Sequence, residues 1–324
     1  MKKIITIIML SIMVISCKEE EMEKESLTKD EVKLSKENES NMLYFATTDE
    51  LKMFISEYNE SETDLLDEAK RMSEEGRYNS LLLVYNLEAD EAKGMGINEE
   101  EVPVVSSDDD MLLLLLNQKG EIGIEDKIFR IDGEFVYSYS QGNSDQINDF
   151  LSVYNNGGVQ INKGETYKFS NELSVYMHPN KVEKQEKKTS AKGATSYVYF
   201  NSNYRMKARQ YNGYWLFYSS IGAKTKVEKR KRFLWWSWWN TVKTDNRLEY
   251  QLSYRVDSTF GFPSVTLNTS GHKYCYCNSA NKVYDWSVGF PAAPNIYVPL
   301  EGQTKHWAHW YSANPNTVSI TLNY

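Results

Sequence analysis

Tryptophan and basic side chains crowd together in the second half of the chain. All 8 tryptophans lie between Trp215 and Trp310, and four of them fall within residues 233–240, directly after the basic run 224–232. An indole ring offers a flat surface for stacking on sugars and favours membrane interfaces, while lysine and arginine attract anionic groups. The candidate ligand-binding residues are therefore Trp235, Trp236, Trp238, Trp239, Lys229, Arg230, Lys231 and Arg232.

The tryptophan-rich octapeptide also has a purely structural interpretation. As one regular strand, residues 233–240 would be apolar on both faces, which is typical of a central strand buried on both sides. We favour this interpretation. The alternative is a hairpin whose tip exposes the indole rings and carries a basic collar.

Histidine and cysteine occur close together in the same half, which raises the question of a metal site. His272, Cys275 and Cys277 alternate with other residues as in a strand, so both thiols face one side and His272 faces the other. Neither they nor His306 and His309 have the spacing of a C-x-x-C pair or an H-E-x-x-H helix. We expect no metal and no cofactor, buried thiols rather than a strained disulfide, and the last two histidines in an edge strand or loop.

Sequence signatures of catalysis are missing from the chain. It has no G-x-S-x-G elbow, no Walker loop, no dinucleotide fingerprint and no recognised catalytic-cysteine context. The paired carboxylates of a glycosidase are harder to assess, because their separation depends on the fold. The acids of the last third are Glu228, Asp245, Glu249, Asp257, Asp285 and Glu301. We expect a non-catalytic protein, with a secreted hydrolase as the alternative.

Charge is distributed unevenly along the chain. From Lys187 onward there are 18 Lys and Arg against 6 Asp and Glu, a net of +12, and the whole chain carries −8, so the first part carries −20. Such asymmetry indicates that the basic part meets an anionic partner, or that the two parts attract each other. Nucleic acid is not expected as the partner, because no recognised binding motif accompanies the charge.

The beginning of the chain has the layout of an export signal. Lys2 and Lys3 precede an apolar stretch, residues 4–15, which is shorter than the roughly 20 apolar residues that a transmembrane helix needs. Ser16 and Cys17 end the stretch, and no A-x-A cleavage site is present. We expect residues 1–16 to be a signal peptide that is removed from the mature protein.

These residues carry a resemblance to a known family. Residues 14–17 resemble the bacterial lipobox, and Lys18-Glu19-Glu20-Glu21 resembles the export tag of Bacteroidota surface lipoproteins. Residues 116–122 and 126–131 are similar to a segment that recurs in uncharacterised lipoproteins of that group. The resemblance implies that Cys17 carries a lipid, and two or more acyl chains hold a protein stably to a membrane. It therefore implies a lipid-anchored protein of the outer membrane that faces the cell exterior. It implies no activity and no site residues, because that family has none assigned.

Composition divides the mature chain into segments. Residues 17–42, which begin with the lipidated cysteine, are rich in Glu, Lys and Ser and predict a disordered acidic tether. Residues 43–180 mix amphipathic helices with hairpins, which predicts a small α+β domain. Helices are expected after Thr47 and over 62–75, 111–116 and 144–154, a hairpin over 121–131, and an apolar strand or extended segment over 78–85.

The rest of the chain is expected to be all-β. Residues 181–194 read as a linker, and residues 195–324 predict a basic, Trp-rich, sandwich-like domain. Apolar and polar residues alternate over 248–256 and 318–324, and shorter strands are expected over 197–200, 204–211, 214–218 and 264–267.

The sequence therefore predicts an α+β fold, in which a small α+β domain precedes a β-sandwich-like domain. The expected function is a surface-exposed lipoprotein that acts as a non-catalytic binding module for a glycan or another anionic surface molecule. Its expected partners are the membrane, through the N-terminal lipid, and that surface molecule. A membrane-inserting, toxin-like protein that uses residues 233–239 as its wedge is a further alternative.

Overall fold

The computed structural model of the protein describes residues 42–61, 63–76, 78–98, 101–105, 107–178, 195–233 and 236–324. The expected signal peptide, Cys17, nearly all of the expected tether and the expected linker lie outside the described residues. The predicted α+β class with a sandwich-like β part is confirmed, because helices and a mixed sheet come first and antiparallel sheets follow.

Short helices form the first part of the described chain, and their caps follow the sequence signals. Thr47 accepts a hydrogen bond from the backbone of Glu50, and Asp64 accepts one from Leu66. Gly76 has a φ of 66° and follows the second helix, as a helix-ending glycine does. The helices are α1 (Thr48–Glu60), α2 (Leu65–Glu74), α3 (Leu81–Val84), α4 (Ala89–Gly94) and α5 (Asp110–Leu115).

One prediction for this part is wrong, because residues 78–85 contain α3 rather than an extended segment. Ser80 accepts a hydrogen bond from the backbone of Leu83, and Leu81, Leu82 and Leu83 are all buried. A run that is apolar at every position does not distinguish a buried strand from a buried helix. Here the serine cap favours the helix.

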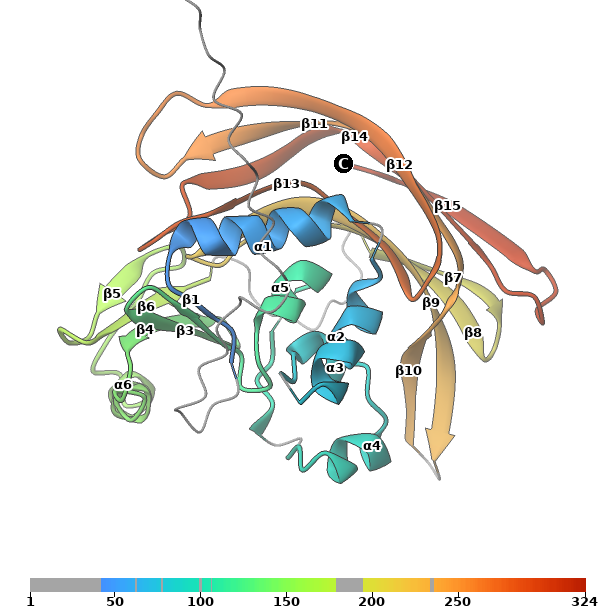
Figure 1. Ribbon diagram of the computed structural model, residues 1–324. Helices are drawn as coiled ribbons and strands as arrows, with labels where there is room; N and C mark the ends of the chain where they lie inside the picture. The colour runs from blue at the N-terminus through green and yellow to red at the C-terminus, as the bar shows by residue number, and fades with distance from the viewer. Residues whose placement is uncertain are drawn as a thin grey trace, which may run out of the picture. The chain divides into compact units, whose positions relative to one another are not determined.

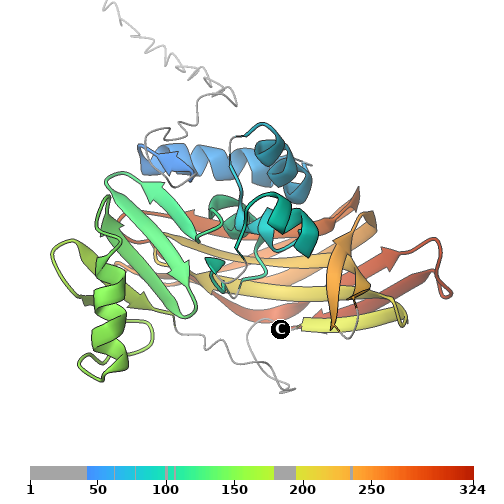
Figure 2. The same cartoon turned by 90° about the horizontal axis from the view of Figure 1, so that it is seen from below.

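A mixed sheet of six described strands, in the order β1-β2-β3-β4-β6-β5, contains the predicted hairpin as β2 and β3. Ile147 and Phe150 of the helix α6 (Gln146–Asn155) pack on one face, while Ile122 and Phe129 on the other face enter the main core. Figure 2 shows α6 on the side of this sheet away from α1–α5. The strands are β1 (Tyr44–Phe45), β2 (Glu121–Ile124), β3 (Lys127–Asp132), β4 (Phe135–Ser140), β5 (Thr166–Lys168) and β6 (Leu173–Met177).

Two antiparallel sheets make up the described chain after residue 194. The inner sheet has the order β10-β9-β8-β7, with β13 also paired to β9, and the outer sheet has the order β12-β11-β14-β15. Their strands are β7 (Thr195–Asn201), β8 (Tyr204–Tyr214), β9 (Tyr218–Phe233), β10 (Trp236–Val242), β11 (Thr244–Ser258), β12 (Val265–Cys277), β13 (Ser279–Val288), β14 (Asn295–His309) and β15 (Thr317–Asn323).

Alternating residues of β9 serve two different layers. Ile221, Ala223 and Val227 are fully buried and pack against residues of the outer sheet. Lys224 and Lys226 lie between them in sequence, and side chains of neighbouring residues in a strand point to opposite faces. The inner sheet therefore has one apolar face toward the outer sheet and one basic face toward the helices.

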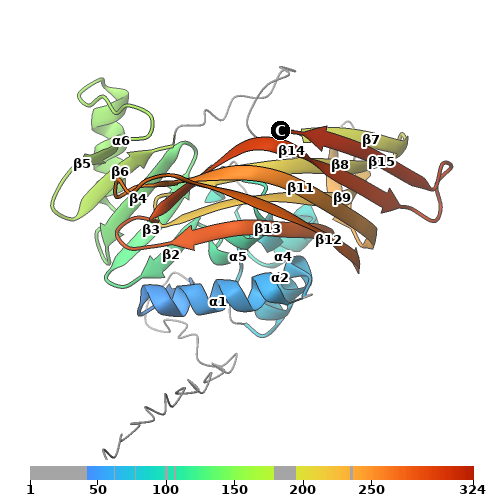
Figure 3. The same cartoon turned by 90° about the horizontal axis from the view of Figure 1, so that it is seen from above.

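The described residues from 42 onward thus form layers. Figure 1 shows the outer sheet above the inner sheet and helices α1, α2, α3 and α5 below it, and Figure 3 views the same layers from the side of the outer sheet. One apolar cluster joins both parts of the chain, because Leu112 and Phe129 belong to it together with Phe217 and Val283. The rings of Phe129 and Phe217 lie 5.0 Å apart.

Three details of the β part correct the sequence predictions. The octapeptide is a hairpin between β9 and β10 rather than a central strand, with Trp236 opposite Phe233. Residues 214–218 turn between β8 and β9, and Leu216 has a φ of 65°. His306 lies in β14, which pairs with a strand on each side and so is neither an edge strand nor a loop.

Candidate functional site

The residues that the sequence singles out lie on the hairpin of β9 and β10. The Arg205 guanidinium carbon is 4.1 Å from the centre of the Trp239 ring, and Arg230 lies opposite Trp239 in the ladder. Lys231 Nζ is 2.6 Å from a carboxylate oxygen of Glu88, and Lys229 belongs to the same strand. Trp235 and the side chains of Arg232, Trp236 and Trp238 lie outside the described residues.

Part of the basic charge meets acids from the first half of the chain. Asp108 Oδ1 is 2.6 Å from Lys207 Nζ, and Asp108 Oδ2 is 3.0 Å from Arg209 Nε. Lys224 Nζ lies 2.8 Å from Asp110 Oδ1, and both groups are buried. Burial alone would raise the pKa of Asp108, but the nearby cations hold it well below its usual range. The basic face of the inner sheet is thus in part an internal ionic layer.

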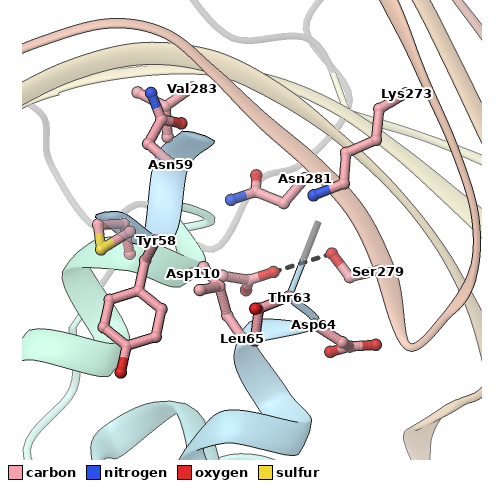
Figure 4. Close-up of a pocket in the computed structure, with 11 residues that line it drawn as sticks. Tyr58, Asn59, Thr63, Asp64, Leu65, Asp110, Lys273, Ser279, Asn281 and Val283 are labelled. Carbon is pink, nitrogen blue, oxygen red and sulfur yellow. Dashed lines mark hydrogen bonds between the residues drawn. The ribbon is translucent and has the colours of Figure 1, made fainter. Parts of the chain in front are cut away.

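The aspartates before α5 cap that helix and also bind the sheet. Asp109 accepts hydrogen bonds of 2.6 Å from Tyr218 and from Ser220 while it caps the helix. Burial raises the pKa of Asp109. Figure 4 shows Asp110 directed toward Ser279, at 2.8 Å, beside a cavity of about 20 Å³, room for about one water molecule. Asp109 therefore both caps α5 and holds it to the inner sheet.

The outer face of the outer sheet presents a different arrangement of similar residue types. We define the aromatic platform as Arg247 on β11, Tyr274 and Tyr276 on β12, Trp307 on β14 and Tyr311 just beyond it. The three tyrosines are exposed to 47, 61 and 67% in that order. Arg247 lies opposite Tyr274 in one ladder and opposite Trp307 in the other. Three neighbouring strands thus place Tyr274, Arg247 and Trp307 in one row.

Stacking orders the platform. The guanidinium carbon of Arg247 is 4.1 Å from the centre of the Tyr274 ring and 4.8 Å from that of Trp307. The His272 ring also stacks on Tyr274, with the ring centres 4.7 Å apart. Planar groups therefore continue from β12 across β11 to β14, and they border a shallow hollow of about 550 Å³.

Carboxylates border the platform as hydrogen-bond acceptors. Tyr274 donates a hydrogen bond of 2.5 Å to Glu249, which Arg247 also contacts. Both hydrogen bonds hold the pKa of Glu249 below its usual range. Tyr311 donates to Asp245, which lies in the next row of the sheet, opposite Tyr276. Glu249 is thus poised to accept hydrogen bonds at neutral pH.

A second shallow hollow of about 540 Å³ lies on the same sheet, further along β11. Its lining is polar rather than aromatic. Gln251 pairs with Ser270 on one side and with Gln303 on the other, so amide and hydroxyl groups meet in a row parallel to that of the platform. The outer face therefore offers flat rings at one end and hydrogen-bonding amides beside them.

The structure joins Cys275 and Cys277 by a disulfide, which corrects the expectation of two buried thiols. The two Cα atoms lie 5.3 Å apart, within the range that a disulfide accepts. As predicted, both cysteines face one side of β12, while His272, Tyr274 and Tyr276 are exposed on the other. The bridge thus closes the backbone directly behind the two platform tyrosines.

Sequence reasoning missed the platform, although its residues carry a signal. Tyr274 and Tyr276 stand two residues apart on one strand, so both side chains point to the same face. Arg247 and Trp307 each lie on one of two other strands. Their approach depends on pairing between strands up to 60 residues apart, as in the ladder of Arg247 and Trp307. Local patterns do not reveal that register.

The turn between β11 and β12 carries two exposed apolar rings. Phe260 is 63% and Phe262 is 70% exposed, and Gly261 between them has a φ of 79°. Large apolar side chains gathered at an exposed tip indicate a surface for contact with another molecule or a membrane. This tip is distinct from the tryptophan hairpin that the sequence had suggested for that role.

Metal ligands, membrane spans and similarity to known proteins bear on what the site could do. Over the described residues, no group of three His, Cys, Asp or Glu side chains could hold a metal ion. None of the described helices is long and apolar enough to cross a membrane. Comparison with protein-family models, curated proteins and solved structures gave no match to this chain.

Proposed function

We propose that this protein is a non-catalytic binding protein of the bacterial cell surface that holds a glycan on its outer sheet face. The observation that carries the proposal is the row in which Arg247 is stacked between Tyr274 and Trp307. An aromatic ring packs on the apolar face of a sugar ring, and the hydroxyl groups at the edge of the sugar stay free to bond with neighbouring residues.

The surroundings of the row support a glycan as the ligand. Sugar hydroxyls both donate and accept hydrogen bonds, and Gln251, Gln303 and Ser270 supply amide and hydroxyl partners in the next hollow. Rows on a strand face recur every two residues, about 6.6 Å apart, so an extended chain of sugars could span both hollows. An extended polymer fits such an open face better than a compact metabolite does.

The lowered pKa of Glu249 favours glycan binding over glycan hydrolysis. A glycosidase needs one carboxylic acid whose pKa is raised so that it can protonate the leaving group. Hydrogen bonds from Tyr274 and Arg247 lower the pKa of Glu249 instead. At this face the carboxylate suits a hydrogen-bond acceptor.

The proposed location rests on the sequence. The apolar stretch of residues 4–15 and Cys17 support a lipid anchor, and residues 18–21 support the outer face of the outer membrane. Intact-mass analysis of protein from its native membrane measures this. A chain that begins at a lipid-modified Cys17 is expected, and an unmodified Cys17 would contradict the proposal.

The glycan proposal is tested with the full-length protein on a glycan array, followed by affinity measurement on the glycans retained. Loss of one stacking ring costs about 1–2 kcal/mol, so Trp307→Ala is expected to weaken binding about 5- to 30-fold. Tyr274→Ala is expected to act in the same direction.

Two control variants separate this face from the other aromatic surfaces. Trp239→Ala changes the β10 tryptophan hairpin, and Phe262→Ser changes the exposed tip of the β11–β12 turn. Both should bind neutral glycans as the wild type does. Binding lost in Trp239→Ala and kept in Trp307→Ala would move the site to the β10 hairpin, and retention of no glycan by the wild type would reject the proposal.

Membrane contact is a second candidate function, favoured by the exposed rings of Phe260 and Phe262. Protein with Cys17→Ser, and therefore without the expected lipid, is mixed with anionic and neutral vesicles and floated. Co-flotation that is lost in the Phe260→Ser, Phe262→Ser double variant would support this candidate. Equal flotation of both proteins, or none, would reject the tip as a membrane contact.

A further inference from the structure

The basic face of the inner sheet is only partly covered by the helices. Between α2, α3 and the segment before α5 on one side and β8, β9 and β10 on the other lies a cavity of about 300 Å³. Lys207, Lys224 and Lys226 line it from the sheet, and Trp239 and Thr241 line it from β10. We call this space the basic cavity. Its volume is at the lower end of the range for small-molecule sites.

Cations outnumber carboxylates around the basic cavity. Its sheet wall and the residues next to it carry five cations, and three carboxylates contact them among the described residues. Asp108 pairs with two of the cations, Glu228 with two and Asp110 with one. Two positive charges therefore remain uncompensated within these pairs, and with the buried Asp109, which also attracts Lys224, the cations still outnumber the carboxylates by one. Excess charge in a poorly solvated site is costly, and a bound anion would offset it. The five cations are Arg205, Lys207, Arg209, Lys224 and Lys226.

The excess positive charge acts on Lys226. Its Nζ lies 3.0 Å from Glu228 and 3.3 Å from the Thr241 hydroxyl. Burial lowers the pKa of Lys226, and the neighbouring Lys224 and Lys207 lower it further, against the attraction of Glu228. An anion beside this amine would relieve the repulsion among the three lysines.

The remaining walls suit a polar ring. Trp239 contributes a flat apolar surface, while Asn86, Asn278 and Ser107 contribute amide and hydroxyl groups. A ligand that combines a ring, hydroxyl groups and one anionic group would use all of these walls. A monosaccharide with an acidic group has this composition.

We propose that the basic cavity binds a small organic anion of monosaccharide size, whose carboxylate or phosphate group lies among Lys207, Lys224 and Lys226. This site is separate from the platform, because the two lie on different sheets of the sandwich. The test of this inference is therefore independent of the test of glycan binding at the outer face.

Calorimetric titration of the full-length protein tests the proposal with four probes: glucuronate, glucose 6-phosphate, neutral glucose and the methyl ester of glucuronic acid. At least one acidic probe is expected to bind with a stoichiometry of one, and the carboxylate and phosphate arms show which group is preferred. The two neutral probes should not bind. The absence of binding by both acidic probes at millimolar concentration would overturn the proposal, as would equal binding of glucose.

Single substitutions test where the acidic probe binds. Lys226→Met removes one charge at nearly constant volume, and Thr241→Phe fills the cavity without changing the charge. Each is expected to weaken the acidic probe at least tenfold. Lys70→Met, on the exposed side of α2, removes an equal charge elsewhere and should have no effect, and Trp307→Ala on the platform should also have none.

Circular dichroism first shows that each variant is folded. If Lys226→Met does not fold, Thr241→Phe decides, because it leaves every ion pair of the cavity in place. Wild-type affinity in Thr241→Phe would overturn the proposed location, and so would an equal loss in Lys70→Met.

Discussion

The ionic layer under the inner sheet and the platform on the outer sheet use the same residue types in opposite ways. In the ionic layer, Lys224 and Asp110 are buried and joined at 2.8 Å. On the platform, Arg247 and Glu249 also pair, but their side chains stay 48 and 30% exposed. A charge inside the protein must be satisfied by the fold, whereas a charge at the surface remains available to a ligand. Solvent exposure, rather than composition, separates structural from functional use here.

The largest effect should come from breaking the buried pair. Asp110→Asn leaves Lys224 without its carboxylate and is expected to reduce the free energy of unfolding by about 3–5 kcal/mol. Urea unfolding measures the loss. Glu249→Gln on the platform is the matched control, with an expected change below about 1 kcal/mol. Equal losses in both variants would remove the distinction between the two regions.

A second effect concerns pH and the buried His306. Its ring nitrogens lie 2.7 Å from the hydroxyls of Thr225 and Thr304, and burial lowers its pKa to about 3. Below the unfolded pKa of about 6.5, the unfolded chain gains a proton that the folded chain does not. This histidine therefore lowers stability as pH falls from about 6.5 toward 3, by about 2 kcal/mol at pH 5.

The control for this pH effect is His306→Gln, which cannot take up the proton. Urea unfolding at several pH values should show a shallower loss of stability between pH 7 and 5 in the variant. A wild-type slope in His306→Gln would assign that part of the pH dependence to other groups.

The disulfide should contribute less to the free energy of unfolding than the buried ion pair does. It closes a loop of three residues, and loop-closure entropy then predicts a stabilisation of about 1.5 kcal/mol. Cys275→Ser with Cys277→Ser is expected to lose that amount on thermal or urea unfolding. Reduction of the wild type should give the same loss. A loss as large as that of Asp110→Asn would show that the bridge supports more than the local strand.

The smallest effect on stability is expected at the centre of the platform. Arg247→Lys keeps the charge but loses the planar group that stacks on Tyr274 and Trp307, so the free energy of unfolding should hardly change. Affinity for a glycan retained on the array should nevertheless fall severalfold. A loss of stability larger than that of the double cysteine variant would place Arg247 with the structural charges.

Local features were readable from the sequence where the signal was local. Thr47 and Gly76 set the ends of helices, and the alternation over residues 248–256 matches β11. The all-apolar residues 81–83 were misjudged, because their periodicity is the same for a buried strand and a buried helix. The fold class needed only such local signals.

The candidate sites depend on the register between strands that are far apart in the chain. For this reason the sequence alone did not reveal them. Arg247 meets Trp307 only through the pairing of β11 with β14. The charge imbalance was visible from the start, but its distribution was not, because Asp108 and Lys207 are 99 residues apart in the chain. Strand pairing decides which lysines are enclosed and which remain open to solvent.

The alternation along β9 has a consequence for how this gene can change. Ile221, Ala223 and Val227 belong to the sandwich, and Lys224 and Lys226 belong to the ionic layer. Insertion or deletion of a single codon within the strand would exchange the two sets and carry ammonium groups into the hydrocarbon layer. A change of two codons preserves the alternation. Length variants of this strand that survive selection should therefore differ by even numbers of residues.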